Sequence, residues 1–337
     1  MARVDDLMSV VQRPDFDIVR AAHVELVVRD LDVSHDFYVD HLGLILTERT
    51  ADALYLRGWE ERLHHSIVLR QGTAPAVDHL AFRVRARDDL DRVSAHFERR
   101  GCKTGWRDAT QSHGRSLRVE DEFGFPLEFF EEMEHVESQL QRFDRQRGAP
   151  IMRFDHFNLH VTAAEPVIEA WQALGFRCAE YISTDGDDGR VTGAWMFRGP
   201  GVHDVALTVG RGPRLHHLGM WVGEPGDVLR ACDQLAAAGY ASCIERGPGR
   251  HGVSNAFFVY LRDPDGHRVE LYSCDYYTGD QDHAPVRWSV NDPRCRTFWG
   301  TRAPDSWYLE SSPLLGADGA QMEIHEPVVD ERTEITA

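Results

Sequence analysis

The sequence predicts an α+β fold of two similar domains, each built from paired β-α-β-β-β modules that form an open barrel around a cleft. The second half of the chain repeats the strand and helix order of the first. Asp78-His79-Leu-Ala-Phe matches His216-His217-Leu-Gly-Met, and Gly124-Phe-Pro-Leu-Glu128 matches Gly266-His-Arg-Val-Glu270. A repeat of this length indicates duplicated modules, and a single module cannot close a sheet alone.

The first half begins with a polar arm over residues 1–20, followed by a strand over 22–28 with alternating apolar side chains. Asp30 to Ser34 opens a helix that ends at Gly43, and a second helix runs from about Asp88 to Arg100. Glycine commonly follows a helix because it adopts the left-handed conformation without strain. Strands rich in β-branched and aromatic residues are expected at 53–56, 66–69, 78–84, 116–119 and 127–130.

The second half is predicted to contain helices over 164–174 and 227–238, each followed by glycine. Arg246 to Asn255 is expected to form a glycine-rich loop. The turn Asp263-Pro264-Asp265-Gly266 joins two strands, because proline presets φ and glycine supplies the unusual dihedral angles. Strands are expected at 154–161, 194–197, 205–209, 217–222, 257–261 and 268–272.

These elements place the two barrels at residues 21–133 and 151–276. The charged segment 134–150 between them is compatible with a linker helix. Residues 277–337 lack clear periodicity but contain many aromatic side chains, which would not suit a disordered tail. We therefore expect this segment to cover the second barrel, with the acidic stretch from Asp318 to Ala337 loose at its end.

Composition excludes several classes of protein. The formal charge of −18 argues against a nucleic-acid partner, and an anionic substrate would need local arginines to hold it. The apolar runs are too short to span a bilayer, and the acidic N-terminus is unlike a signal peptide. The six cysteines are scattered without CxxC spacing, which favours reduced thiols and a cytoplasmic location.

Three residues in strand-like segments indicate a metal centre. Glu270 lies between Val269 and Leu271, where an unpaired carboxylate is costly. His156 and His217 occur upstream in similar contexts, and two imidazoles with one carboxylate form the facial triad of non-haem Fe(II) oxygenases. The alternative is that both histidines are hydrogen-bonded in the core and that Glu270 pairs with an arginine such as Arg268.

The motifs around these residues resemble the type I extradiol ring-cleaving dioxygenases of the vicinal oxygen chelate superfamily, from about residue 15 to about 310. The most specific combination is Arg250-His-Gly252 with Asp263-Pro-Asp-Gly-His-Arg-Val-Glu270. The other stretches that carry the resemblance are Asp155-His-Phe-Asn158, Val202-His-Asp204, Gly212-Pro-Arg-Leu-His-His217 and Asp275-Tyr-Tyr-Thr-Gly-Asp280.

The resemblance implies meta cleavage of a catechol by O₂ at Fe(II), in aromatic compound catabolism by a homotetramer. The same ligands accept Mn(II). It implies that His203 is an acid–base residue that orients O₂ and delivers a proton, for which imidazole has a suitable pKa. His251 would donate to a substrate oxygen, and Tyr260 would hydrogen-bond the phenolate oxygen. A surface histidine at 203 and an ordinary strand tyrosine at 260 are the alternatives.

The resemblance further implies that the substrate is 3,4-dihydroxyphenylacetate, which would give 5-carboxymethyl-2-hydroxymuconate semialdehyde. Arg246 and Arg296 could clamp its carboxylate, because a guanidinium fork matches carboxylate geometry. Arg294 competes with Arg296, which falls at the matching place before Phe-Trp-Gly300. Asn158 shares a strand face with His156 and is a candidate substrate contact. Trp195 is a candidate wall of the ring pocket, with plain core packing as the alternative.

The first half carries His23, His79 and Glu128 at the positions equivalent to the triad, and His65 at the position equivalent to His203. They are either a second metal site or a remnant of duplication that serves packing. Because the resembled family uses only its second barrel, we expect no working metal site in residues 21–133. The corresponding loop is also incomplete here, with Ser112-His113-Gly114 in place of Arg-His-Gly.

Three other functions remain open at this point. The chain could cleave an alkyl- or biaryl-substituted catechol, or act as a metal-dependent isomerase or lyase on the same scaffold. It could also be a non-catalytic protein that binds aromatic acids, although such a protein has no need of an open metal site. His203, His251 and Tyr260 together favour oxygen chemistry.

Overall fold

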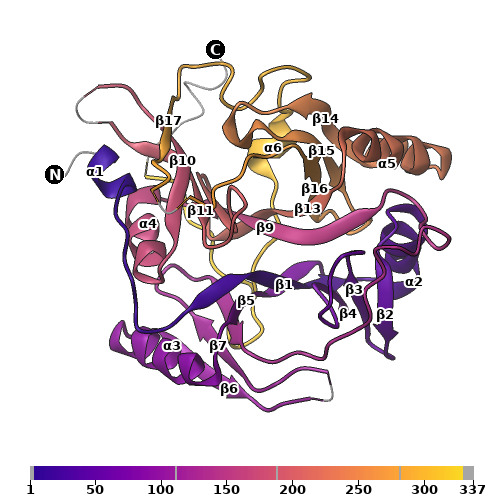
Figure 1. The fold of residues 1–337 in the computed structure, drawn as a ribbon, viewed down its shortest axis with the longest axis horizontal. Helices are drawn as coiled ribbons and strands as arrows, with labels where there is room; N and C mark the ends of the chain where they lie inside the picture. Colours follow the sequence, from indigo (N-terminus) through magenta and orange to yellow (C-terminus); the bar gives the residue numbers. More distant parts are fainter. Residues whose placement is uncertain (1–3, 111, 187–188, 281, 329–337) are drawn as a thin grey trace.

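The computed structural model describes residues 4–110, 112–186, 189–280 and 282–328. Each half of the chain forms one mixed β-sheet. Figure 1 shows the two sheets on opposite sides of the molecule, and their strands β1 and β9 lie side by side where the halves meet. The first sheet has the strand order β2-β3-β4-β1-β5-β8-β7-β6. Its strands are β1 (Ile18–Val28), β2 (Ile45–Arg49), β3 (Ala53–Arg57), β4 (Ile67–Gln71), β5 (Ala76–Val84), β6 (Lys103–Arg107), β7 (Ser116–Glu120) and β8 (Pro126–Phe130).

The second sheet has the order β14-β15-β16-β13-β9-β12-β11-β10-β17. Read from its other end and without β17, this order is that of the first sheet, with β10 in the place of β2 and β14 in the place of β6. The predicted duplication and the α+β fold class are therefore confirmed. The strands are β9 (Ile151–Val161), β10 (Arg177–Ser183), β11 (Val191–Phe197), β12 (Val205–Val209), β13 (Arg214–Val222), β14 (Ile244–Arg250), β15 (Phe257–Arg262), β16 (Arg268–Ser273) and β17 (Val286–Ser289).

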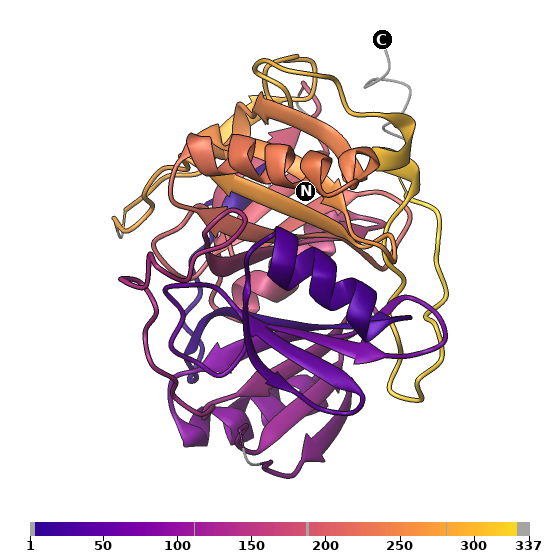
Figure 2. The same ribbon diagram turned by 90° about the vertical axis from the view of Figure 1, so that its right-hand side faces the viewer.

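The helices pack on the apolar faces of the sheets, and in Figure 2 the indigo helix that begins at Leu31 lies between the two halves. The helix predicted after Asp30 begins as α2 (Leu31–His35), which Asp30 caps, and continues as a π-helical turn over Asp36–His41. The long helices α3 (Arg87–Arg99) and α5 (Pro225–Ala237) end close to Gly101 and Gly239, which both adopt positive φ as predicted. The remaining helices are α1 (Val4–Met8), α4 (Ala164–Ala173) and α6 (Asp305–Leu309), with 3-10 turns at Ala241–Cys243 and Val253–Asn255.

The prediction of a linker helix over 134–150 is wrong. This segment, which the structure describes in full, crosses between the halves as turns and isolated bridges. Its apolar side chains do not form a buried stripe, since Phe143 is 73% exposed and Leu140 is 39% exposed. A short helix in water needs such a packed face, so the charged composition was not sufficient.

Two other predictions change. Arg246 to Arg250 belongs to strand β14, which pairs with β15 across an irregularity between Arg246 and Gly249, and is not a free loop. The tail is tied down as far as Val328, whose amide donates to the Thr162 carbonyl, and His325 bridges to Gly212. These backbone hydrogen bonds outweigh the acidic composition of the stretch. The rest of the tail, 329–337, lies outside the described residues.

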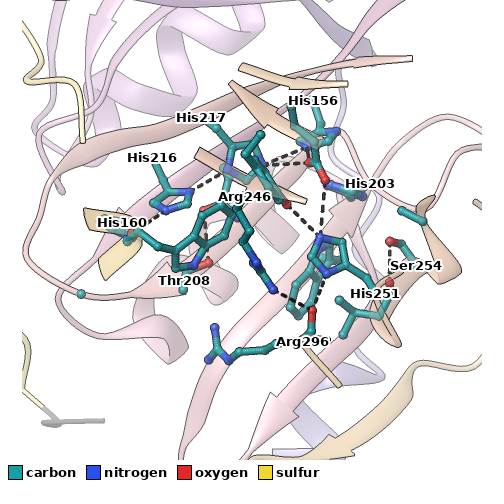
Figure 3. Close-up of a pocket in the computed structure, with 18 of the residues that line it drawn as sticks. His156, His160, His203, Thr208, His216, His217, Arg246, His251, Ser254 and Arg296 are labelled. Carbon is teal, nitrogen blue, oxygen red and sulfur yellow. Dashed lines mark hydrogen bonds and ion pairs between the residues drawn. The ribbon is translucent and has the colours of Figure 1, made fainter. Parts of the chain in front are cut away.

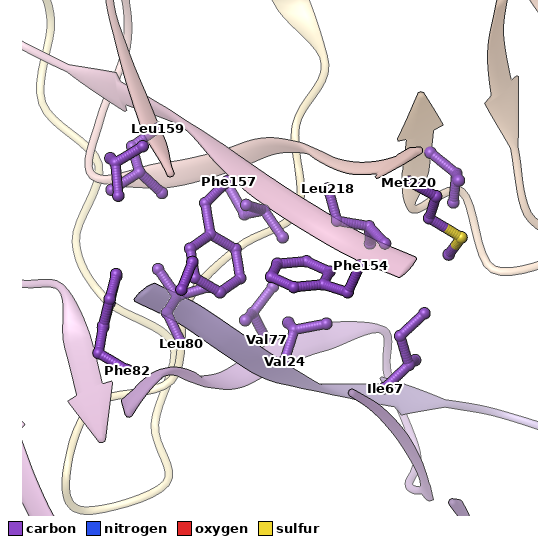
Figure 4. Close-up of a cluster of buried hydrophobic side chains, with 14 of the residues drawn as sticks. Val24, Ile67, Val77, Leu80, Phe82, Phe154, Phe157, Leu159, Leu218 and Met220 are labelled. Carbon is purple, nitrogen blue, oxygen red and sulfur yellow. The ribbon is translucent and has the colours of Figure 1, made fainter. Parts of the chain in front are cut away.

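Apolar side chains from both halves form one core between the sheets. Figure 4 shows Val24, Leu80 and Phe82 of the first half facing Phe154, Phe157 and Leu218 of the second, and all are at least nine-tenths buried. Phe157 and Leu159 point into this core, whereas His156, Asn158 and His160 alternate to the opposite face of β9. The polar face of each sheet is thereby left free for a site. None of the helices in the described ranges is both long and apolar enough to cross a membrane.

Candidate metal centre and substrate pocket

Three neighbouring strands of the second sheet place His156, His217 and Glu270 on one face. In the pairing of β9 with β13, His156 lies opposite Gly219 and Asn158 lies opposite His217. In the pairing of β13 with β16, Gly219 lies opposite Glu270. Gly219 therefore stands between the imidazole of His156 and the carboxylate of Glu270, and His217 lies two residues before it on the same strand.

Gly219 is required by the close approach of the His156 ring. A Cβ atom at this position would lie 2.1 Å from Cε1 and 2.4 Å from Nδ1 of His156. Real side chains do not approach so closely, so any other residue would displace the ring. The glycine thus allows the imidazole to lie flat against the middle strand.

The three side chains bring their ligand atoms to one point. Nε2 of His156 and Nε2 of His217 lie 3.3 and 3.2 Å from Oε2 of Glu270, and 3.2 Å from each other. All three residues are at most 4% exposed. Two imidazoles and one carboxylate on one side of a point are the ligand set of mononuclear Fe(II) and Mn(II) centres, with further positions left open.

A chain of hydrogen bonds directs the lone pair of His217 toward this point. Nε2 of His216 lies 2.9 Å from the carbonyl oxygen of Trp307, an acceptor, so this nitrogen carries the hydrogen. Nδ1 of His216 must then accept from Nδ1 of His217, 2.6 Å away. Nε2 of His217 is left as a bare lone pair, which suits a metal ligand.

His156 is oriented by Asp155, which pairs with its Nδ1 at 3.1 Å and also accepts from the Tyr272 hydroxyl. Asp155 is the extra residue of a bulge, since the pairing of β9 with β13 shifts between His156 and Phe154. Such bulges re-aim side chains next to functional sites. This one turns His156 to the polar face and supplies the carboxylate that holds it.

The electrostatics favour a charged Glu270. Burial opposes ionisation, but the neighbouring imidazoles, above all that of His156, hold the pKa of Glu270 well below its usual range. Burial would also lower the pKa of His156, yet hydrogen bonds with Asp155 and Glu270 raise it to about 9. Burial lowers the pKa of His217 to about 4. A cation bound between the three would replace the proton that His156 otherwise retains.

Arg268, the alternative partner of Glu270, does not contact it. Its guanidinium instead forms hydrogen bonds of 2.5 and 3.0 Å with Glu245 and donates to carbonyl oxygens, including that of His216. Glu270 therefore faces histidines rather than an arginine. The donor set fits a divalent metal ion, because its negative charge would otherwise be balanced only by a proton shared with imidazoles.

A pocket opens beside the ligand atoms, and Figure 3 shows His203, His251 and Arg246 around it. The His203 ring lies 3.9 Å from the His156 ring, and its Nδ1 is buried without a hydrogen-bond partner in the described part of the chain. His251 donates from Nδ1 to the Arg296 carbonyl at 2.5 Å, which leaves Nε2 to accept from the Tyr260 hydroxyl at 2.9 Å. The three residues predicted to act on oxygen or substrate thus line one cavity.

Arg246 enters the pocket from β14 and is 3% exposed. Its Nη2 donates to Thr297 Oγ1 at 2.7 Å and to the Arg296 carbonyl at 3.2 Å, and its guanidinium lies over the Trp307 ring at 4.6 Å. Its Nε has no hydrogen-bond partner, and no acidic side chain of the described residues forms an ion pair with it. A buried guanidinium without a carboxylate is prepared for an anionic ligand.

The structure separates the two arginines proposed from the tail. Arg296 lines the pocket, whereas Arg294 is exposed and pairs with Asp292 at 2.8 Å. Asn158 and Trp195 also line the pocket. Asn158 accepts from Thr208 Oγ1 at 3.1 Å, and Trp195 packs between the clusters around Val202 and Val253.

Several residues of the site were not predicted from the sequence. Trp307 belongs to α6 and lines the pocket. The centroid of its ring lies 4.2 Å from that of Tyr260. Asp155 and His216 lie directly before the two histidine ligands, so their adjacency was a usable signal. His160 follows Asn158 by two residues on the same face and lines the pocket. The contribution of Trp307 had no local signal beyond the aromatic content of the tail.

The known proteins that are similar to this chain include ring-cleaving dioxygenases. The model of the Glyoxalase/Bleomycin resistance protein/Dioxygenase superfamily matches residues 20–129 and 153–271, one match for each half. The chain is 32% identical to a metapyrocatechase of Geobacillus stearothermophilus, covering 90% of this chain and 96% of the relative. It is 31% identical to a manganese-dependent 2,3-dihydroxybiphenyl 1,2-dioxygenase of Geobacillus genomosp. 3, covering 84% and 94%.

Among solved structures, the chain is similar to the homoprotocatechuate 2,3-dioxygenase of Brevibacterium fuscum in its anaerobic complex with 3,4-dihydroxyphenylacetate. The TM-score is 0.90 at 44% identity, covering 93% of this chain and 98% of the other. A variant of the same enzyme in complex with HPCA gives a TM-score of 0.91 at the same identity, covering 94% of this chain and 88% of the other. The similarity therefore extends over both sheets and the tail.

Gly219→Ala should weaken metal binding without altering a ligand, because the new Cβ would displace the His156 ring. We expect at least about a tenfold loss of Fe(II) affinity, the size typical of changes that disturb ligand orientation. Chelator competition under nitrogen measures it. Gly223→Ala is the control, since the nearest atom to its Cβ is a side-chain oxygen at 3.5 Å. Unchanged affinity in Gly219→Ala would contradict the assigned geometry.

Proposed function

The chain belongs to the Glyoxalase/Bleomycin resistance protein/Dioxygenase superfamily, as a type I extradiol dioxygenase, and on that premise we propose that it opens 3,4-dihydroxyphenylacetate with O₂ at an Fe(II) centre. The product would be 5-carboxymethyl-2-hydroxymuconate semialdehyde, which retains both oxygen atoms of O₂. The observation that carries the proposal is the convergence of His156, His217 and Glu270 beside a pocket containing a buried, unpaired Arg246. We assign the reaction to residues 151–276, with the tail as cover, and no reaction to residues 21–133.

His156, His217 and Glu270 would hold the ion. When bound, Fe(II) supplies adjacent positions for the two catechol oxygens and for O₂, and passes electrons between them. Mn(II) is the second candidate, because one relative is named as manganese-dependent. Metal analysis of protein purified without added metal decides between them.

His203 acts as the acid–base residue in this proposal. Burial and the neighbouring His156 lower its pKa well below the usual range, so its ring is neutral before substrate arrives. Its Nδ1 has no partner in the described ranges and can exchange a proton with a group in the pocket. A neutral imidazole can accept a proton from a catechol hydroxyl and later return it to an oxygen atom derived from O₂.

His251 and Tyr260 position the substrate. Burial and Glu270 raise the pKa of Tyr260 well above its usual range, so the hydroxyl keeps its proton and can donate it. It donates to His251 Nε2 in this structure and could turn toward a phenolate oxygen. Asn158 and Trp195 complete the wall next to the ring.

Arg246 and Arg296 would bind the carboxymethyl group. Support comes from the burial of Arg246 and from the absence of an acidic partner among the described residues. A substrate carboxylate would supply the missing charge, and the guanidinium geometry matches it. The net charge of the protein would otherwise disfavour an anion.

The proposal includes a cytoplasmic homotetramer. All six cysteines remain free thiols, which fits a reducing compartment. The tetramer rests on the resemblance to the family. Sedimentation equilibrium of the purified chain tests it.

Oxygen uptake tests the activity directly. Wild-type protein loaded with Fe(II) should consume equal amounts of O₂ and 3,4-dihydroxyphenylacetate and give a yellow ring-opened product. His217→Ala should have no activity, because two remaining ligands hold Fe(II) too weakly against water. His96→Ala, on α3 in the first half, is the control and should behave as wild type. Binding of catechols without O₂ uptake by the wild type would instead indicate a non-catalytic binding protein.

His203→Gln should separate binding from oxygen chemistry. Because His203 is not a ligand, iron content and anaerobic catechol binding should remain near those of the wild type. The value of kcat should fall by about a hundredfold or more, as expected for the loss of an acid–base group. Single-turnover O₂ kinetics measures the effect. An unchanged rate in this variant would remove His203 from the mechanism.

Replacing Arg246 by Met should lower kcat/KM for 3,4-dihydroxyphenylacetate roughly ten- to a hundredfold, since a charge-assisted contact contributes about 1.5–3 kcal/mol. Methionine retains apolar packing against Trp307 while removing the charge. The same variant should change little with 4-methylcatechol, which has no carboxylate. Arg296→Met should follow the same pattern, and Arg294→Met should not. Equal losses on both substrates would assign the arginines to structure and favour an alkyl- or biaryl-catechol.

A further inference from the structure

The first sheet repeats the ligand geometry of the second. His23 on β1 lies opposite Ala81 of β5, Glu25 lies opposite His79, and Ala81 lies opposite Glu128 of β8. These are the pairings that His156, His217 and Glu270 make around Gly219. His23, His79 and Glu128 are therefore held on one face by the same strand register, and all three are at most 4% exposed.

A fourth residue joins this cluster, in contrast to the second half. Oε1 of Glu128 lies 3.5 Å from His23 Nε2, 3.8 Å from His79 Nε2 and 3.4 Å from His113 Nε2. His251, the counterpart of His113, approaches Oε1 of Glu270, whereas His156 and His217 approach Oε2. In the first half all three imidazoles converge on one carboxylate oxygen.

Two of these imidazoles have their lone pairs directed inward. His79 pairs through Nδ1 with the Asp78 carboxylate at 2.8 Å, and His113 pairs through Nδ1 with the Gly114 carbonyl at 2.8 Å. Both partners are acceptors, so both Nδ1 atoms carry the hydrogen and both Nε2 atoms are bare. A ligand histidine is commonly held in this way by a carboxylate or carbonyl behind it.

The cluster consequently has too few N–H donors for its acceptor atoms. His23 Nε2 lies 3.0 Å from His79 Nε2 and can donate to it, but the buried Nε2 of His113 still has no hydrogen-bond partner among the described residues. Nδ1 of His23 is also buried without one. Bare nitrogens and a carboxylate oxygen crowded around one point repel each other unless a cation lies between them.

Arg118 makes the centre different from the one in the second half. It lies opposite Glu128 on β7, the place that Tyr260 occupies opposite Glu270. Arg118 binds Oε2 of Glu128 and, at 2.7 Å, the Asp78 carboxylate, so one oxygen of Glu128 remains for an ion. The nearby Glu25 is likewise paired with Arg70 at 2.5 Å.

We propose that the first half of the chain binds one structural Zn²⁺ ion through His23, His79, His113 and Glu128. Three imidazoles and one carboxylate oxygen make a closed four-ligand set of the kind zinc prefers. No position is left for substrate, and the ion would tie strands β1, β5 and β8 to the segment before β7. The half without a reaction would then use its copy of the ligands for stability.

The test uses the full chain with the second site disabled, as His217→Gln/Glu270→Gln. After chelator treatment this protein should bind about one Zn²⁺ per chain in competition with a colorimetric zinc indicator. Zinc should also raise its Tm, because an ion that binds only the folded chain stabilises it. Neither measurement depends on activity, so failure of the proposed reaction and failure of this site are distinguishable.

Adding His113→Gln or Glu128→Gln to that background should abolish both the zinc uptake and the zinc-dependent rise in Tm. The Tm of each variant without metal, and its circular dichroism, show whether it is folded. His65→Gln is the matched control, because this buried histidine pairs with His64 through Nδ1 and is not among the ligands. It should bind zinc normally. Absence of zinc uptake by the background protein, or equal uptake after Glu128→Gln, would overturn the proposal.

Discussion

The contact between the His156 ring and the backbone of Gly219 is the constraint on which the second half of the molecule depends. Only a residue without a side chain lets the imidazole lie against the middle strand, between β9 and β16. Bulges at Asp155 and His216 then turn the neighbouring residues so that each supports the histidine that follows it. Ligand position and ligand orientation thus come from the same strand register.

The site also concentrates positive charge inside an acidic protein. A divalent ion would balance Glu270, and Arg246 is buried against Trp307 and Phe258 without an acidic partner in the described residues. Burial of an unpaired guanidinium destabilises the empty site, and that cost is offset when a carboxylate binds. In the proposed function, this arrangement would favour an anionic substrate despite the net charge of −18.

The two halves show how one scaffold supports two kinds of centre. A tyrosine opposite the ligand carboxylate in the second half leaves both of its oxygens to face histidines, whereas an arginine in the first half occupies one oxygen. His251 is drawn toward Tyr260, and its counterpart His113 is directed toward the other imidazoles. The residue at this strand position, Tyr260 or Arg118, thus differs between the half with the pocket and the half with the proposed zinc site.

The sequence alone determined the duplication, the strand and helix order, and the triad His156, His217 and Glu270, because these depend on local patterns repeated at matching places. It did not predict the irregular linker, nor strands β10 and β17, which close one end of the second sheet and whose side chains alternate weakly. Only the tertiary structure decided that Trp307 directs the lone pair of His217, that Arg246 is buried without an acidic partner, and that His113 converges with His23. These features depend on hydrogen-bond directions between residues far apart in the chain, such as the 91 positions between His216 and Trp307. Such directions are set by packing and leave no periodic signal in the sequence.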